Sequence, residues 1–203
     1  MDAMDAIGKR NVELVAQVKP EQWDHPTPCA DWDVRTLVDH LIVGRHVYRG
    51  LLDGVPAAEL GPIRERQSKA IGNDPVAACE RTVRSIREAF SEPGALERTV
   101  HHRIGDMPGS ELLVQLVADL VVHSWDLATA IGVDPGLDEQ LVELAYVFYA
   151  PRMQKEVMYA YGWFRPPAKP LPEGATPLER LIHLVDQPSR PARQARPGGA
   201  AGS

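Results

Sequence analysis

The spacing of hydrophobic positions along the chain predicts a mainly helical protein. In the stretch 34–51, apolar residues recur at intervals of three and four, which places them on one face of a helix. The same period, about 3.6 residues, recurs in further segments of the chain. These predicted helices cover residues 4–19, 75 to about 90, 111–131 and a stretch that begins near 137.

Capping residues and prolines indicate where these helices begin and end. Asp33 and Ser110 are expected N-caps, because their short polar side chains can accept hydrogen bonds from the first helical turn. Gly132 is expected to end the fourth helix. Pro20 is expected to close the first helix, and Pro151 to kink or interrupt the fifth.

Two segments break the helical pattern. Residues 99–104 are expected to form a short strand or an extended arm, followed by a turn at Pro108 and Gly109. Residues 163–175 contain several prolines and are expected to be extended. The pattern as a whole therefore predicts a mainly α fold, a helical bundle with a short extended or β arm.

The end of the chain contains a last short helix and a tail. Residues 176–179 form a capping box with proline at the first helical position. After residue 187 no apolar residue larger than alanine occurs, so 188–203 is predicted to be a disordered tail rich in proline, arginine and glycine. The remainder, 1–187, is predicted to be a single domain.

Composition and charge narrow the class of partner. The 203 residues carry a formal net charge of −6, which disfavours a nucleic acid or an anionic membrane surface as the partner. No run of about 18 apolar residues indicates a membrane span, and the N-terminus lacks the pattern of a signal peptide. We therefore predict a cytoplasmic protein in which Cys29 and Cys79 are free thiols.

One polar pair lies inside an otherwise apolar helical stretch. In the segment DLVVHSWDLA, Asp119 and His123 are four residues apart and therefore share one helix face. His40 points inward from the helix 34–51 together with its apolar positions. The three side chains can converge on a metal ion if the two helices are neighbours. Otherwise Asp119 and His123 are a hydrogen-bonded pair within one helix, or two surface residues without a joint role.

Two imidazoles and one carboxylate form a known metal-ligand set. For zinc, three protein ligands leave a position open, which is the catalytic arrangement. The same set also suits non-haem iron. A divalent cation would offset the cost of burying Asp119. The candidate metal ligands are therefore His40, Asp119 and His123.

Three segments, in order, carry a resemblance to a known family. They are TPCADWDVRTLVDHL, DLVVHSWDLATAIG and GWFRPPAKPLPEGATPLERLIHLV. In this combination the chain resembles the metal-binding proteins related to mycothiol-dependent maleylpyruvate isomerase, within the DinB-like superfamily. The resemblance covers most of residues 5–186 and implies a four-helix bundle with one divalent metal ion. It implies His40 and His123 as ligands, with Asp119 at the position where the isomerase has Glu.

The resemblance also implies an activity. A low-molecular-weight thiol, mycothiol in that family, would add to a small-molecule electrophile or be transferred onto it, in an isomerisation or an S-transfer. Zn²⁺ is the expected metal, with Ni²⁺ or Fe²⁺ as alternatives, and a homodimer is expected because bundles of this superfamily often pair. Two other functions stay open: a protein that binds metal or a small ligand without turnover, and an iron oxygenase.

The other histidines are given local roles. His46 lies six residues after His40 and is expected at the surface or in a hydrogen bond. His183 on the last helix is expected in packing or at the surface. If their segment is extended, either His101 or His102 can face a pocket, because alternate residues of a strand point to opposite sides.

Cys29 and Asp126 lie close in sequence to the candidate ligands and have two interpretations each. Cys29 precedes the second helix, where it is expected to pack its loop rather than act as a reactive thiol of lowered pKa. Asp126 is expected to cap or pair locally rather than to orient a metal ligand.

Overall fold

The protein is mainly helical, with one small two-stranded sheet. The structure is a computed structural model of the chain. It describes residues 1–60, 71–154, 167 and 170–185. The predicted tail, 188–203, and part of the predicted proline-rich segment lie outside the described residues.

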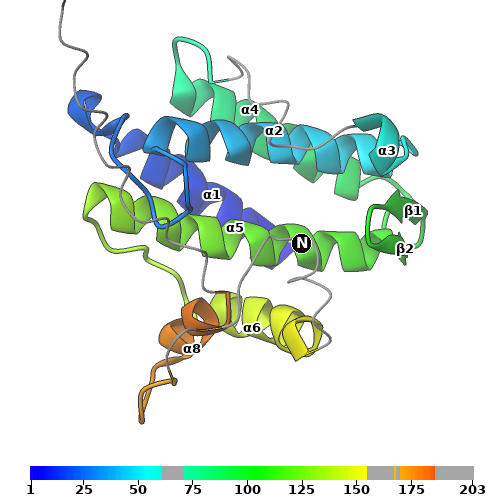
Figure 1. Ribbon diagram of the computed structural model, residues 1–203. Coiled ribbons are helices and arrows are strands. Elements are labelled where there is room, and N and C mark those ends of the chain that lie inside the picture. Colours follow the sequence, from blue (N-terminus) through cyan, green and yellow to red (C-terminus); the bar gives the residue numbers. More distant parts are fainter. Residues whose placement is uncertain (61–70, 155–166, 168–169, 186–203) are drawn as a thin grey trace, which may run out of the picture.

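Four helices form the bundle at the centre of the fold (Figure 1). The first two in the chain, α1 and α2, each pack against both α4 and α5, which closes a ring of four contacts. Their inward faces carry the leucine, isoleucine and valine side chains of one continuous core. The bounds are Asp2–Ala16 for α1, Val34–Leu52 for α2, Pro75–Phe90 for α4 and Gly109–Ile131 for α5.

Smaller elements surround this bundle. Helix α6 packs on α5, and α8 packs on α6, so both lie on the α5 side of the molecule (Figure 1). The two strands form an antiparallel hairpin beside α2 and α5. The bounds are Pro20–Gln22 for the 3₁₀ helix η1, Ala57–Leu60 for α3, Thr99–His102 for β1, Gly105–Pro108 for β2, Glu139–Gln154 for α6 and Pro177–Leu184 for α8.

The first helix ends earlier than predicted. It stops at Ala16, and Pro20 begins the 3₁₀ helix η1 instead of closing α1. The backbone N–H groups of Gln17 and Val18 donate to carbonyls three residues back, at 3.1 and 3.3 Å. Such bonds tighten the last turn and satisfy its carbonyls, so the helix ends before the proline is reached.

The predicted extended arm is confirmed, but the predicted turn after it is wrong. Thr99 pairs with Pro108 and His102 pairs with Gly105, so the chain reverses at residues 103–104. Pro108 is therefore the last residue of β2 rather than a turn residue. Gly105 has a φ of +117°, a conformation that favours glycine, and this is the local signal for the reversal.

Ser110 does not cap the fourth predicted helix. Helix α5 begins at Gly109, and its N-cap position is Pro108, without a side-chain hydrogen bond. The backbone N–H groups of Gly109 and Ser110 instead donate to carbonyls of the preceding loop, each at 2.8 Å. The loop approaches so closely that a Cβ at position 109 would lie 1.9 Å from the Ala95 carbonyl oxygen, which requires glycine there.

Pro151 does not interrupt α6, which continues through it to Gln154. A proline has no N–H to donate, so the carbonyl of Val147 lacks its usual helical partner. Val147 is 60% exposed, which lets water reach that side of the helix. The Arg152 side chain also donates to the Phe148 carbonyl at 2.7 Å and supports the last turn.

Helix α5 is the most apolar of the described helices. By length and composition it could cross a membrane, yet 67% of its apolar window is buried inside the protein. A central helix of a bundle has this character because neighbouring helices cover several of its sides.

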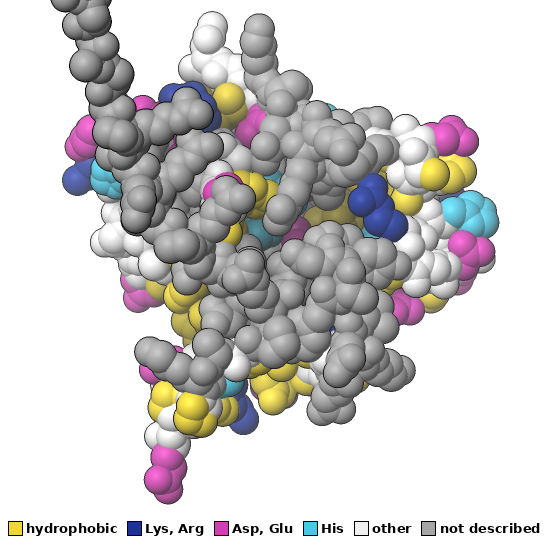
Figure 2. Space-filling view, viewed as in Figure 1, with side chains coloured by type: hydrophobic (Ala, Val, Ile, Leu, Met, Phe, Trp, Pro, Cys, Tyr) yellow, Lys and Arg dark blue, Asp and Glu magenta, His cyan; other side chains and the backbone are white. Residues whose placement is uncertain are grey.

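On the face in Figure 2, acidic side chains are scattered, and Lys and Arg show only at separate places.

The capping box predicted at residues 176–179 is present and gives a stability prediction. Thr176 Oγ1 accepts from the Glu179 N–H at 3.2 Å, and the Thr176 N–H donates to Glu179 Oε2 at 2.8 Å. Thr176→Ala is expected to lower the free energy of unfolding by about 1 kcal/mol, because the first turn of α8 loses its acceptor. Thermal unfolding measures this change, and Thr176→Ser, which keeps the hydroxyl, is the control. Equal unfolding temperatures for both variants would contradict the prediction.

The same box makes the contribution of Glu179 dependent on pH. Hydrogen bonds from Thr176 lower the pKa of the Glu179 carboxyl. The stabilisation is therefore present above the pKa of the unfolded chain and is lost as pH falls through the lower pKa of the folded chain.

Candidate metal centre

The packing of α2 against α5 brings the three candidate ligands together. Nε2 of His40 lies 3.9 Å from Oδ2 of Asp119, and Nε2 of His123 lies 3.7 Å from Oδ1 of the same carboxylate. Donor atoms of all three residues lie within 4.8 Å of one another. The convergence expected from the two helices is therefore present in the fold.

The spacing of these atoms fits a metal ion better than a set of hydrogen bonds. A hydrogen bond between nitrogen and oxygen has a length of about 2.7–3.2 Å, so separations of 3.7 and 3.9 Å are too long. Two atoms that each lie about 2.1 Å from a tetrahedral ion are about 3.4 Å apart. The observed separations are slightly wider, and small movements of the side chains would close them around an ion.

The electrostatics of the cluster also suit a cation. Burial alone would raise the pKa of Asp119, but the charges of His123 and His40 lower it below its ordinary value. Burial alone would lower the pKa of His123, but Asp119 and the hydrogen bond to Asp126 raise it well above its ordinary value. The ionised Asp119 carboxylate thus favours a positive charge on the neighbouring His123 ring, and a divalent ion would supply positive charge at the same place.

One side of the cluster is open to solvent. The side chains of His40 and His123 are 10% and 9% exposed, whereas that of Asp119 is 31% exposed. An ion held by the three groups would therefore be shielded on the imidazole side and reachable beside the carboxylate.

The loop before α2 covers the imidazole side. The Trp32 ring lies 4.6 Å from the His40 ring and 5.8 Å from the His123 ring, between ring centres. Backbone hydrogen bonds fold the loop onto the start of α2, among them Val34 N–H to the His25 carbonyl at 3.0 Å. Asp33 then caps α2 by accepting from the Thr36 N–H at 2.7 Å, as its sequence position predicts. The contacts of the Trp32 ring with both histidines therefore hold this loop against the body of the protein.

Behind His123, a second group of side chains is in direct contact. Its ring Nδ1 lies 2.9 Å from Oδ2 of Asp126, three residues later on α5. The Cys29 thiol donates to the same carboxylate oxygen at 3.1 Å. Asp126 therefore pairs locally, as predicted, and its partner is the candidate ligand His123. The spacing of His123 and Asp126 at i and i+3 was the available sequence signal.

Cys29 does not have the character of a reactive thiol. It is buried, and burial raises its pKa, although the hydrogen bond and the charge of His123 oppose this. The packing role expected for it is therefore observed, with a contact to Asp126 that the sequence did not indicate. Neither Cys29 nor Cys79 forms a disulfide.

The other histidines lie away from the three ligands. His46 is exposed, as predicted. His101 is also exposed and pairs with Asp106 at 2.9 Å. His102 is half-buried, and its Nε2 lies 3.3 Å from the amide nitrogen of Gln115, one helical turn before Asp119. His183 is half-buried in α8, consistent with a packing role.

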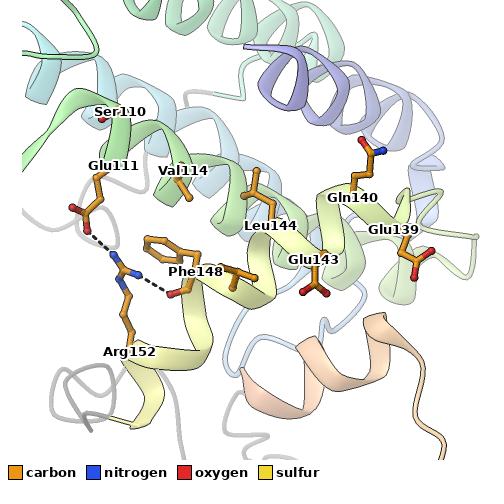
Figure 3. Close-up of a pocket in the computed structure, with 10 residues that line it drawn as sticks. Ser110, Glu111, Val114, Glu139, Gln140, Glu143, Leu144, Phe148 and Arg152 are labelled. Carbon is orange, nitrogen blue, oxygen red and sulfur yellow. Dashed lines mark hydrogen bonds and ion pairs between the residues drawn. The ribbon is translucent and has the colours of Figure 1, made fainter.

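A surface groove lies on the other side of α5, against α6 (Figure 3). Val114, Leu144 and Phe148 give it an apolar floor, and Arg152 pairs with Glu111 at its end at 2.5 Å. None of its lining residues belongs to the candidate metal centre. The groove is therefore separate from the candidate metal centre.

Comparisons with known proteins identify a family and two relatives to which this chain is similar. The family model of the mycothiol maleylpyruvate isomerase N-terminal domain matches residues 4–128, a range that includes His40, Asp119 and His123. Two curated relatives, described as uncharacterized proteins of Mycobacterium tuberculosis strains CDC 1551 and H37Rv, are each 29% identical over 168 residues. Those alignments cover 82% of this chain and 83% of each relative. No solved structure matches the chain at a significant level.

Proposed function

Because the chain belongs to the family of the mycothiol maleylpyruvate isomerase N-terminal domain, we propose that it is a divalent-metal enzyme that joins a low-molecular-weight thiol to a small electrophile. The metal ligands in this proposal are His40, Asp119 and His123. The observation that carries it is the spacing of their donor atoms, 3.7–3.9 Å from carboxylate to each imidazole. Zn²⁺ is the proposed metal, with Ni²⁺ or Fe²⁺ as alternatives, and mycothiol is the proposed thiol.

Each residue has a defined task in this proposal. Two neutral imidazoles and one carboxylate would hold the ion by three bonds, a set that leaves coordination positions open. A bound divalent ion supplies a Lewis acid that lowers the pKa of a thiol reaching it. The Trp32 ring excludes water from the imidazole side, and the exposed edge of Asp119 marks the side on which thiol and electrophile would meet.

The bond changes follow from the chemistry of a thiol. In S-transfer, sulfur forms a bond to the electrophilic carbon, a leaving group departs with its electron pair, and the thiol proton passes to solvent. In isomerisation, the thiolate sulfur adds to one carbon of a double bond conjugated to a carbonyl, and the π electron pair moves onto that carbonyl. The resulting single bond rotates, the electron pair returns to re-form the double bond, and the thiolate leaves. Both reactions require the thiolate form at neutral pH, which is the form that the proposed site favours.

A conjugation assay tests the proposal. Protein stripped of metal by a chelator, then given Zn²⁺, is incubated with mycothiol and monochlorobimane, whose carbon–chlorine bond breaks as the carbon–sulfur bond forms. We expect the fluorescent thioether to form in the reloaded protein, and at the uncatalysed rate in the stripped protein and in His123→Ala. The exposed histidine at position 46 supplies the control, since His46→Ala is expected to keep the wild-type rate.

Other results of this assay would point to other functions. One bound metal ion without thioether formation across several electrophiles would favour a binding protein without turnover. Oxygen consumption by the Fe²⁺-loaded protein would favour an iron oxygenase, which uses the same two-histidine, one-carboxylate set. Thioether formation that is unaffected by metal removal would contradict the proposed role of the ion.

A further inference from the structure

The carboxylate of Asp126 joins two buried partners through one oxygen. Its Oδ2 lies 2.9 Å from Nδ1 of His123 and 3.1 Å from Sγ of Cys29. Asp126 is 1% exposed, Cys29 2% and His123 7%, so water does not replace either contact. A buried carboxylate is costly unless hydrogen bonds satisfy it. The buried Asp126 carboxylate is therefore stabilised by its contacts with His123 and Cys29.

The direction of these hydrogen bonds determines which ring nitrogen carries hydrogen. A carboxylate can only accept, so Nδ1 of His123 must be the donor toward Asp126. In a neutral imidazole, a hydrogen on Nδ1 leaves the lone pair on Nε2. Nε2 is the atom that lies 3.7 Å from Asp119. The Asp126 contact therefore presents the correct nitrogen to the candidate metal centre.

Cys29 contributes by the direction in which it donates. Its sulfur lies 3.7 Å from Nδ1 of His123, within reach of a sulfur hydrogen bond, but the closer contact is to Asp126. Because the S–H group points to the carboxylate, it does not donate to Nδ1 and does not force the hydrogen of the ring onto Nε2. It also supplies the second donor to Oδ2 and so holds the carboxylate in place.

We infer that Asp126 and Cys29 are positioning residues, which together hold His123 with hydrogen on Nδ1 and with Nε2 directed at the ion. This inference rests on the proposed metal site. It assigns Cys29, in a loop 94 residues before its partner His123, a part in metal affinity without contact to the metal.

The distances distinguish a positioning role of Cys29 and Asp126 from a role as metal ligands. Cys29, His123 and Asp126 also have donor atoms within 4.8 Å of one another. Their separations of 2.9 and 3.1 Å, however, are those of direct hydrogen bonds. The His40, Asp119 and His123 set is more widely spaced, at 3.7–3.9 Å. The geometry thus assigns the ion to one side of the His123 ring and the hydrogen bonds to the other.

The test measures metal affinity instead of activity. Dissociation constants for Zn²⁺ and Co²⁺ are determined by competition with a chromophoric chelator for the wild type, Asp126→Asn, Cys29→Ala and Cys29→Ser. We expect about 10–100-fold weaker binding for Asp126→Asn and about tenfold for Cys29→Ala, the range typical of residues that orient a ligand. Cys29→Ser keeps a donor and is expected to restore most of the affinity. Cys79→Ala, which removes another buried thiol outside this group, is the matched control.

A second measurement needs no variant. In the Zn²⁺-loaded wild type, a long-range ¹H–¹⁵N spectrum of the histidine rings reports which nitrogen of His123 carries hydrogen. We expect hydrogen on Nδ1 and none on Nε2. The reverse pattern would overturn the inference, even if the Cys29 variants do not fold.

The results distinguish this inference from the proposed function. Wild-type protein that binds no divalent ion would remove both. Wild-type binding with unchanged affinity in Asp126→Asn and Cys29→Ala would overturn the positioning role alone, and a lower unfolding temperature in Cys29→Ala would then mean packing only. A thiolate-to-cobalt charge-transfer band that disappears in Cys29→Ala would make Cys29 a ligand and would also overturn the inference.

Discussion

Replacing His40 by alanine is expected to reduce the metal content of the purified protein from about one equivalent per chain to near zero. Two ligands would remain, Asp119 and His123, and these lie on one helix with their donor atoms 3.7 Å apart. Of the three candidate ligands, His40 alone comes from α2. Its loss therefore removes the link that a bound ion would make between α2 and α5. Elemental analysis of the natively purified protein measures the change.

Matched variants show whether the effect is specific to the metal centre. His46→Ala removes an exposed histidine from the same helix and is expected to keep the metal. Asp119→Asn removes a charge at nearly constant size and is expected to lose the metal, whereas Asp119→Glu keeps a carboxylate and is expected to retain it. Unchanged metal content in His40→Ala would remove His40 from the site. Loss in His46→Ala as well would mean that α2 had been disturbed generally.

Replacing Asn11 by leucine is expected to lower the free energy of unfolding by about 3 kcal/mol. Asn11 is fully buried, and its Oδ1 accepts a hydrogen bond from the guanidinium of Arg45. Its Nδ2 donates to Ser124 Oγ at 2.5 Å. Arg45 is 2% exposed, and burial already lowers its pKa. Leucine fills the space but leaves the buried cation without one of its acceptors, and urea unfolding followed by circular dichroism measures the cost.

A double variant tests the cause of that loss. In Asn11→Leu with Arg45→Met, the cation is removed together with its acceptor, so the double variant is expected to be more stable than Asn11→Leu alone. Thr82→Val serves as the control, because the Thr82 hydroxyl is buried but donates only to the Cys79 carbonyl of its own helix, at 2.9 Å. A double variant less stable than the single one would show that Arg45 stabilises the core independently of Asn11.

Much of the fold follows from local patterns that the sequence displays directly. The apolar periodicity identified α2, α4 and α5, and Asp33 and the box at 176–179 cap their helices as predicted. The exceptions are at helix ends. Ser110 is a suitable cap by residue type, but the N–H groups of Gly109 and Ser110 donate to carbonyls of the preceding loop, and α5 begins at Gly109, so Ser110 lies inside the helix. Hydrogen-bond partners that lie outside the local segment do not appear in its periodicity or its capping residues, so the sequence does not reveal them.

The candidate site likewise has features that local sequence patterns predict and contacts that they do not. Asp119 and His123 share a helix face because four residues make about one turn, and His40 shares its face with the apolar positions of α2. Those facts are local. The contacts of His123 with Cys29 and of His40 with Trp32 join segments that the periodicity treats separately, and the loop that carries Cys29 and Trp32 has no period at all.

The sequence by itself therefore determined which side chains face inward and at what spacing along each helix, since helical geometry alone sets both. Only the tertiary structure decided that α2 packs beside α5, that the loop before α2 closes over the His40 side, and that Asp126 meets Cys29 behind His123. The physical reason is that helix neighbours are chosen by the burial of whole apolar faces. Many pairings satisfy one helix, and the complete core selects among them.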